Sequence, residues 1–279
     1  MKAYTSNNIR NIAVLGHGGK GKTTLCEAML YIAGASDRLG RVADGNTVLD
    51  FDSEEKRRKS SVSSAIAALE WDNTKLNIID APGLFDFEGG AAEAVRAAEA
   101  VLIVTSAGSG VDVGTEKAFR AADKKGAAKF FAVTKTDSDH RNFYKTFDAL
   151  KEVYGNKLCP TIIPYMEGNI TKCYVNLMTG MAFSYDENGK ATKVPVPEAS
   201  VIEEMTSAFM EAVATTDDAL MEKFFEGEKF TKEEILKGLC IGIFDGSIYP
   251  VYAVSGLTCA GVDQLLYGLA WAAPGAFGY

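Results

Sequence analysis

Residues 16–23 constrain this chain more than any other part of its sequence. They read Gly-His-Gly-Gly-Lys-Gly-Lys-Thr and fit the pattern G-x-x-x-x-G-K-[ST]. An apolar run at residues 12–15 precedes them, and a helical pattern at residues 24–33 follows. In such a strand–loop–helix unit the glycines let successive backbone N–H groups turn inward around phosphate oxygens, at the positive end of the helix. The segment therefore predicts a phosphate-binding loop that holds a nucleotide.

Two side chains of this loop have expected roles in the chemistry. Lys22 would reach the β- and γ-phosphates and serve in catalysis, and the hydroxyl of Thr23 would bind Mg²⁺. A glycine-rich turn without a ligand is the alternative, but the strand before the loop and the helix after it argue against that reading. The residues that we expect at the nucleotide here are His17, Gly18, Gly19, Lys20, Gly21, Lys22, Thr23 and Thr24.

A second motif, Asp-Ala-Pro-Gly at residues 80–83, begins at the last residue of the predicted strand 76–80. A carboxylate at the end of a strand beside the phosphate loop holds Mg²⁺ through water, and we expect this role for Asp80. The N–H of Gly83 would sense a γ-phosphate and take part in catalysis. Alone, D-x-P-G also describes an ordinary turn. Its place on the strand predicted to neighbour the phosphate loop favours the cation site.

A third motif points to guanine as the base. Thr134, Lys135 and Asp137 close the apolar run 129–134. A carboxylate at Asp137 can accept paired hydrogen bonds from guanine N1–H and the exocyclic amino group, a donor pair that adenine lacks. Lys135 would lie over the base with its aliphatic stem. A solvated strand end is the alternative for these residues taken alone.

A fourth motif follows the last apolar run, residues 250–254. Ser255, Gly256 and Leu257 can offer backbone N–H groups to guanine O6, although a simple turn would also explain them. All four motifs fall at the carboxyl ends of predicted strands, and ligands of open α/β sheets bind at that edge. Their order along the chain therefore favours a guanine-nucleotide site over four unrelated turns.

The fold class follows from the alternation of apolar runs and helical patterns up to about residue 134. Near-continuous apolar strands separated by helices predict an α/β fold with a mostly parallel sheet covered on both faces. Residues 65–71 and 76–80 look like a hairpin, and a helix is expected from about His140 to residue 154. We interpret residues 157–249 as an inserted α+β subdomain, in which four prolines bracket a small β region before a helical stretch at 198–238. Those prolines are Pro160, Pro164, Pro195 and Pro197.

Composition excludes several classes of protein. Of 279 residues, 47% are hydrophobic and 24% charged, which excludes a disordered chain. The net charge of −8 argues against a basic nucleic-acid binder, and we expect no sequence-specific nucleic-acid contact, no membrane association and no oligomer. An odd number of cysteines without a C-x-x-C pair favours a reducing compartment, and so the cytoplasm. They are Cys26, Cys159, Cys173, Cys240 and Cys259.

Together these motifs resemble the guanine-nucleotide domain of a translational GTPase such as elongation factor G or one of its paralogues. Residues 80–87 are similar to the family's D-T-P-G-H-V-D-F, and Gly108-Ser109-Gly110-Val111 resembles the stretch after the family's next strand. The segment 157–249 resembles the subdomain that elongation factor G carries between its lysine–aspartate and serine motifs. The similarity runs over nearly all of the chain.

The resemblance implies a P-loop GTPase fold over residues 1–279, with GTP or GDP and Mg²⁺ as ligands. It also implies that GTP orders two switch segments, whose release on hydrolysis frees the factor from the ribosome during elongation or translocation. The ribosome is thus the expected partner, through domains that the family has beyond this one. Because the chain stops at Tyr279, about where the next domain should begin, a piece of a longer protein is one expectation.

The sequence departs from the family at both switch segments. The family's first switch reads R-G-I-T-I, and the best match here, residues 58–62, puts Ser61 at the threonine that completes the Mg²⁺ shell. We therefore expect Ser61 at the metal and in catalysis, with a flexible basic loop as the alternative. In the second switch, Leu84 replaces the histidine that positions the attacking water. Because a positioned group of this kind contributes about 10²–10⁴-fold in rate, slow intrinsic hydrolysis is expected.

The phosphate loop and the guanine motif also depart from the family. Gly19 stands where the family has aspartate, and Lys20 replaces a smaller or neutral residue and is expected to point outward. His17 falls where the family also has histidine and is expected to pack beside the loop. Thr134 replaces the asparagine of N-K-x-D, and its hydroxyl can still tie two loops together.

Three other functions compete with a hydrolysing switch. One is a regulatory module that binds GTP or GDP with little turnover, which Leu84 supports. Another is a translational GTPase of the ribosome-protection or peptide-release type. The third, an ATPase of the partitioning type with K-G-G-x-G-K-T, needs a lysine where this chain has His17 and has no use for residues 134–137.

Overall fold

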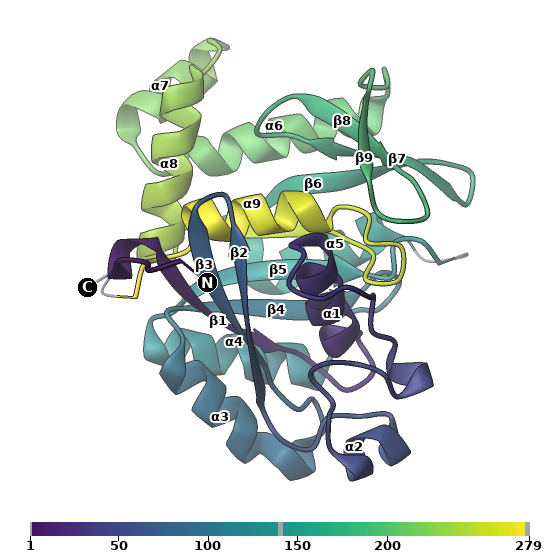
Figure 1. Cartoon of the computed structure of the whole chain (residues 1–279). Helices are drawn as coiled ribbons and strands as arrows, with labels where there is room; N and C mark the ends of the chain where they lie inside the picture. Colours follow the sequence, from purple (N-terminus) through teal and green to yellow (C-terminus); the bar gives the residue numbers. More distant parts are fainter. Residues whose placement is uncertain (1, 139–141, 277–279) are drawn as a thin grey trace.

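The computed structural model describes residues 2–138 and 142–276. Within these residues one sheet of ten strands runs through the molecule, in the order β2-β3-β1-β4-β5-β10-β6-β7-β8-β9 (Figure 1). The strands are β1 Ile9–Leu15, β2 Ala65–Trp71, β3 Thr74–Asp80, β4 Ala100–Ser106, β5 Ala128–Thr134, β6 Leu158–Glu167, β7 Ile170–Asn176, β8 Met181–Tyr185, β9 Ala191–Val194 and β10 Tyr249–Ala253.

Helices cover both faces of this sheet, which confirms the expected α/β fold. Helices α1 and α9 pack together on one face, and α3 and α4 pack together on the other (Figure 1). No helix of the described ranges has the length and apolar character needed to cross a membrane. The helices are α1 Lys22–Ile32, α2 Ser53–Arg58, α3 Glu88–Ala97, α4 Val113–Lys125, α5 Phe143–Tyr154, α6 Ser200–Ala214, α7 Asp218–Glu226, α8 Lys232–Asp245 and α9 Val262–Ala272.

The central strands are parallel and deeply buried. β3, β1, β4, β5, β10 and β6 pair in parallel, and every residue of β4 and of β5 is buried. Strands covered on both faces need apolar side chains on both, which explains their near-continuous apolar sequences. Because the strands are parallel, the carboxyl ends of β1, β3, β4, β5 and β10 lie at one edge of the sheet. All four predicted nucleotide motifs follow strands of this set.

The predicted hairpin of residues 65–80 is confirmed. β2 and β3 are antiparallel, and the two residues that join them, Asp72 and Asn73, have φ angles of 43° and 57°. A two-residue hairpin turn whose twist matches that of the strands needs positive φ at both central residues. Asparagine and aspartate tolerate such φ angles. The turn therefore fixes the register that places Asp80 at the end of β3.

The segment 157–249 differs in two ways from the sequence expectation. β6–β9 continue the sheet beyond β10, and Pro160 and Pro164 lie within β6 instead of bracketing a β region. Pro160 pairs only with β10 and Pro164 only with β7, so neither missing N–H interrupts a ladder on both sides. The helical stretch expected at 198–238 is three helices, α6 to α8, and reaches Asp245.

Helix α5 begins later than the sequence pattern indicated. Its first residue is Phe143, and the side chain of Asn142 accepts hydrogen bonds from the N–H groups of Tyr144 and Lys145. An asparagine at this position satisfies N–H groups that have no partner within the helix, so the helix starts there. The expected start, His140, lies outside the described residues.

Candidate nucleotide-binding site

The predicted phosphate loop lies between β1 and α1. Gly16, Gly19 and Gly21 have φ angles of 143°, 75° and 86°, a region that favours glycine. Gly21 is the N-cap of α1, and no side chain caps this end of the helix. A Cβ on Gly16 would clash with the carbonyl oxygen of Val104 in β4. The loop therefore turns tightly over the sheet and directs the positive end of α1 at one hollow.

That hollow is a cavity of about 180 Å³, bordered by the loop and by Val42, Asp50, residues 59–61, Gly83 and Lys135. Lys22 lies in it, 7% exposed, and its Nζ donates to the carbonyl oxygen of His17 at 3.3 Å. Burial lowers the pKa of Lys22, and the negative charge of Asp80 opposes that shift. A Cβ on Gly83 would clash with Nζ of Lys22. The predicted lysine and the predicted Gly83 thus meet at the same cavity.

Oxygen atoms of four buried side chains meet at the start of α1. Thr23 Oγ1 donates to Asp80 Oδ2 at 2.6 Å and lies 3.1 Å from Ser61 Oγ. Ser61 Oγ in turn lies 2.7 Å from Asp50 Oδ1 and donates to it. Asp80 Oδ1 is buried without a hydrogen-bond partner. Burial raises the pKa of Asp80 to about 7, against the opposing effects of Lys22 and the Thr23 hydroxyl.

This set of oxygens fits Mg²⁺. The ion is usually held by one or two carboxylates together with waters and substrate phosphates, and both carboxylates here lie beside the phosphate cavity. A cation would also satisfy the buried oxygen of Asp80 that has no partner. Thr23, Ser61 and Asp80 were expected at such a site, whereas Asp50 was not. Asp50 belongs to none of the four sequence motifs, so only the fold reveals it.

The guanine motif lies against the phosphate loop. Thr134 Oγ1 is 2.6 Å from the carbonyl oxygen of Lys20 and 2.9 Å from that of Thr105, so it ties the phosphate loop to the end of β4 as expected. Lys135 has a φ angle of 60°, and its Nζ donates to the carbonyl oxygen of Gly19 at 2.8 Å. Its side chain therefore crosses the phosphate loop.

Asp137 and the loop after β10 border a second hollow, of about 330 Å³. Asp137 is exposed there, on the same side as Thr258 of that loop. The N–H of Ser255 donates to the carbonyl oxygen of Ala260 at 2.9 Å and is thus used within its own loop. Of the three residues expected at guanine O6, Gly256 lies against the backbone of α1 and Leu257 is 47% exposed.

Comparison with known proteins agrees with this geometry. Residues 7–274 match the model of a family described as the elongation factor Tu GTP binding domain. The chain belongs to this family.

Two further similarities concern relatives of this GTP-binding domain. An elongation factor G-like protein, found in two strains of Mycobacterium tuberculosis, is 32% identical over 261 residues, which cover 92% of this chain and 36% of that protein. A crystal structure of a protein from Thermus thermophilus is similar with a TM-score of 0.89 and 35% identity, over 96% of this chain and 41% of that one. The chain thus spans little more than a third of the length of these curated relatives.

The second switch of this GTP-binding domain has an aliphatic side chain beside the phosphate loop. Leu84 is 40% exposed, and its Cδ2 lies 3.0 Å from where a Cβ on Gly18 would be. The next residue, Phe85, packs edge-on against the ring of His17, with 5.6 Å between centroids. His17 is therefore a packing residue, as expected, and its backbone oxygen rather than its ring contacts Lys22. No hydrogen-bonding group stands at position 84.

The expectation that Lys20 points outward is wrong. Its Nζ forms an ion pair with Asp112 Oδ2 at 3.1 Å and donates to Ser109 Oγ at 2.8 Å. Asp112 is also the N-cap of α4, where it accepts from the N–H of Thr115. The charge of Lys20 is thus directed at the loop after β4, and only its backbone belongs to the phosphate cradle.

Strand β7 supports the guanine motif from the other side. The hydroxyl of Thr136 lies 2.7 Å from that of Tyr174 and 3.0 Å from the carbonyl oxygen of Val254. Thr171 Oγ1 donates to the carbonyl oxygen of Thr136 at 2.9 Å. Both partners of Thr136 from β7 belong to the segment 157–249, so this segment holds the turn that carries Asp137.

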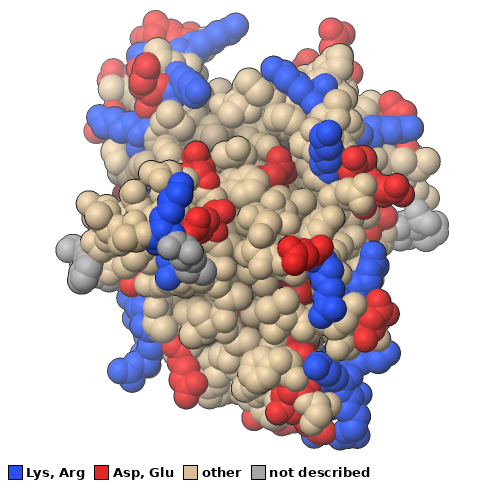
Figure 2. All heavy atoms as spheres, in the orientation of Figure 1, with Lys and Arg blue, Asp and Glu red and all other residues tan. Residues whose placement is uncertain are grey.

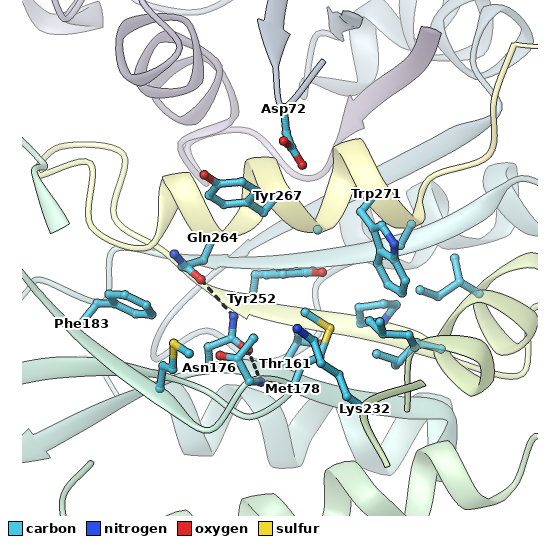
Figure 3. A pocket seen from close by; sticks show the side chains of 18 residues that line it. Asp72, Thr161, Asn176, Met178, Phe183, Lys232, Tyr252, Gln264, Tyr267 and Trp271 are labelled. Atoms are coloured by element: carbon cyan, nitrogen blue, oxygen red, sulfur yellow. Dashed lines mark hydrogen bonds between the residues drawn. The ribbon is translucent and has the colours of Figure 1, made fainter. Parts of the chain in front are cut away.

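An apolar hollow of about 410 Å³ lies elsewhere, along α9. Tyr267 and Trp271 of α9 border one side of it, and Asn176 and Phe183 of β7 and β8 border the other (Figure 3). Asn176 Nδ2 donates to Gln264 Oε1 at 2.9 Å across the space between them. Among the described residues that line this hollow, none is predicted to bind the nucleotide, so it is separate from the candidate site.

Proposed function

We propose that this chain binds GTP and GDP with Mg²⁺ and hydrolyses GTP to GDP and phosphate. The observation that carries the proposal is the contact of Thr134 and Lys135 with the carbonyl oxygens of the phosphate loop. Lys135 contacts the phosphate loop, and Asp137, whose carboxylate we propose to bind the base, follows Lys135 by two residues. One nucleotide could then occupy both sites.

The chain's own residues would act on GTP mainly through position and charge. Backbone N–H groups of residues 18–23 orient the phosphates, and Lys22 stabilises negative charge at the β- and γ-phosphates. When bound, Mg²⁺ supplies further positive charge at these oxygens, held by the side chains of Thr23 and Ser61 and through water by Asp80. Gly83 borders the cavity, and we expect its N–H to face the γ-phosphate. The aliphatic side chain of Leu84 lies beside Gly18 and cannot hold or orient a water.

The proposed setting is translation on the ribosome, in the cytoplasm. The family match and the elongation factor G-like relative support this setting, and the five cysteines are free. Figure 2 shows positive and negative side chains interspersed over the visible face, with a group of positive ones over α2. We propose that residues 56–59 of that region, Lys-Arg-Arg-Lys, contact RNA on an otherwise acidic chain, although Arg57 and Arg58 also pair with Glu54.

A second function, a GTP- or GDP-binding module with little turnover, is favoured by Leu84. The two functions predict different rates of phosphate release from GTP, measured with and without ribosomes. Release that ribosomes accelerate supports the hydrolysing switch. Tight GTP binding without release in either condition supports the binding module, and faster release from ATP than from GTP would contradict both.

Leu84→His is expected to accelerate hydrolysis of bound GTP. An imidazole at position 84 would lie beside Gly18 of the phosphate loop and could orient a water, a contribution of about 10²-fold or more when the group is well placed. The measurement is single-turnover phosphate release at saturating protein. Leu84→Ala is the matched control, because it removes the leucine without adding a hydrogen-bonding group. Equal rates for the histidine and alanine variants would contradict the assignment.

Tyr174→Phe is expected to accelerate GDP release about 2- to 10-fold, since it removes one buried hydrogen bond to the turn that carries Asp137. Dissociation of a fluorescent GDP analogue measures this rate. Tyr144→Phe is the control: its hydroxyl donates to the carbonyl oxygen of Pro164 at 2.6 Å, away from the guanine motif. If both variants release GDP at the rate of the unmodified chain, β7 does not hold this turn.

A further inference from the structure

Two irregular segments carry Asp50 and Ser61 to the start of α1. Residues 46–50 precede α2 and residues 60–64 follow it, and neither segment belongs to a helix or a strand. Both side chains are nevertheless buried, at 4% and 8% exposure. Backbone without regular pairing needs other partners to hold a fixed position. Two buried glutamates supply them.

The first of these is Glu27, in the middle of α1. Its side chain is fully buried, and Oε1 accepts hydrogen bonds from the N–H groups of Val48 at 2.8 Å and Leu49 at 3.0 Å. Oε2 is buried without a partner, and a Cβ on Gly40 would clash with it. The backbone thus closes over this carboxylate, and the two bonded residues directly precede Asp50.

The second is Glu55, in α2, which is 1% exposed. Its Oε1 accepts from the N–H of Val62 at 3.0 Å and from that of Ser63 at 3.3 Å. Its Oε2 accepts from the N–H of Asp52 at 3.3 Å. The two residues bonded to Oε1 directly follow Ser61. Glu55 therefore holds the segment that follows α2 in the sequence, as Glu27 holds the segment that precedes it.

Burying two carboxylates costs free energy unless hydrogen bonds compensate for the lost water. Burial raises the pKa of Glu27, which reflects this cost. An apolar side chain at either position would avoid the cost but would leave two backbone N–H groups without partners. What the carboxylates achieve is local: each fixes the backbone within two residues of Asp50 or Ser61.

We propose that Glu27 and Glu55 are positioning residues that hold Asp50 and Ser61 at Thr23, so that the cation site is assembled before a nucleotide binds. In GTPases the γ-phosphate and its Mg²⁺ order the switch loops. Here the order of residues 46–64 comes from carboxylates of the protein itself. The inference rests on the proposed function, which gives Ser61 its role toward Mg²⁺, and on the hydrogen bond that joins Ser61 to Asp50.

The test compares Glu27→Ala and Glu55→Ala with Glu54→Ala. Glu54 is the matched control because it is adjacent to Glu55, while its carboxylate accepts hydrogen bonds from the exposed side chains of Arg57 and Arg58. The first readout is hydrogen exchange of the nucleotide-free chain. We expect faster exchange of Val48 and Leu49 in Glu27→Ala and of Val62 and Ser63 in Glu55→Ala, with no change in the control.

The second readout is the Mg²⁺ concentration needed for half-maximal tightening of GDP binding, titrated from a chelator-buffered baseline. We expect it to rise about tenfold in each of the two alanine variants, because lost hydrogen bonds free the segments that carry Asp50 and Ser61. GDP affinity in excess chelator should stay unchanged. Glu27→Gln, whose amide oxygen can accept the same two N–H groups, should restore the Mg²⁺ dependence.

Several outcomes would overturn the positioning role. One is unchanged Mg²⁺ dependence in both alanine variants despite faster exchange, and another is a Glu27→Gln variant as impaired as Glu27→Ala. Should Glu27→Ala not fold, Gly40→Ala replaces it, since its methyl group would push the loop off Glu27 with the carboxylate in place. Failure of the unmodified chain to bind GDP at any Mg²⁺ concentration would contradict the proposed function, while hydrogen exchange would still decide the role of the glutamates.

Discussion

Asp137→Asn is expected to lower the affinity for GDP about 10²–10⁴-fold, because two charge-assisted hydrogen bonds to guanine, worth about 1.5–3 kcal/mol each, lose their acceptor pair. Asparagine offers one acceptor and one donor, a pair that matches N1–H and the 2-oxo group of xanthine. The same variant should therefore bind XDP more tightly than GDP. Competition of the two nucleotides against a fluorescent GDP analogue measures the change.

The control for Asp137→Asn is Glu187→Gln. Glu187 lines the same hollow and is exposed, so its variant removes an equal charge from the same place without touching the proposed base contact. It should keep the preference for GDP over XDP. If Asp137→Asn also keeps that preference, Asp137 does not read the base and the guanine assignment is wrong.

Lys22→Ala is expected to lower the affinity for GTP about 10²–10⁴-fold, through loss of charge-assisted contacts of about 1.5–3 kcal/mol each to the β- and γ-phosphates. With GDP, the variant would lose only the contact between Lys22 and the β-phosphate, so the affinity for GDP should fall less. The lysine also offsets the negative charge of Asp50 and Asp80 at the cavity. Its removal should therefore weaken nucleotide binding even at saturating Mg²⁺.

Calorimetric titration of Lys22→Ala with GTP and with GDP gives both affinities. Lys75→Ala, at the opposite end of β3 from Asp80, controls for the loss of one positive charge. Equal losses for GTP and GDP would contradict a contact of Lys22 with the γ-phosphate. An affinity close to that of the control would contradict its place in the phosphate site.

Much of the site could be predicted from sequence because of a property of parallel sheets. Each motif follows an apolar run, and parallel strands bring their carboxyl ends to one edge. Asp80 therefore contacts Thr23, and Thr134 contacts the phosphate loop at Lys20, although these residues are far apart in the chain. The hairpin of β2 and β3 was equally readable, since Asp72 and Asn73 mark its turn. In these cases local pattern and tertiary position agree.

The remainder depended on contacts that no local pattern marks. Asp50 lies in irregular backbone, which has no sequence period, and Glu27 and Glu55 bond to such backbone from their helices. Lys20 was expected to point outward, but its partner Asp112 belongs to a distant part of the sequence that the fold places beside it. Pro160 was expected to mark the edge of a β region, because proline lacks an N–H for strand pairing. The structure shows that Pro160 pairs with β10 alone, which only the topology reveals.

The central claim is that one guanosine phosphate binds at both Asp137 and the phosphate loop. Calorimetric titration of the purified chain with GDP and with ADP, each in excess Mg²⁺, tests it most directly. We expect saturable binding of one GDP per chain and ADP binding at least about 10²-fold weaker, since adenine lacks the donor pair for the carboxylate. Equal affinity for the two nucleotides, or no binding of GDP, would contradict the claim.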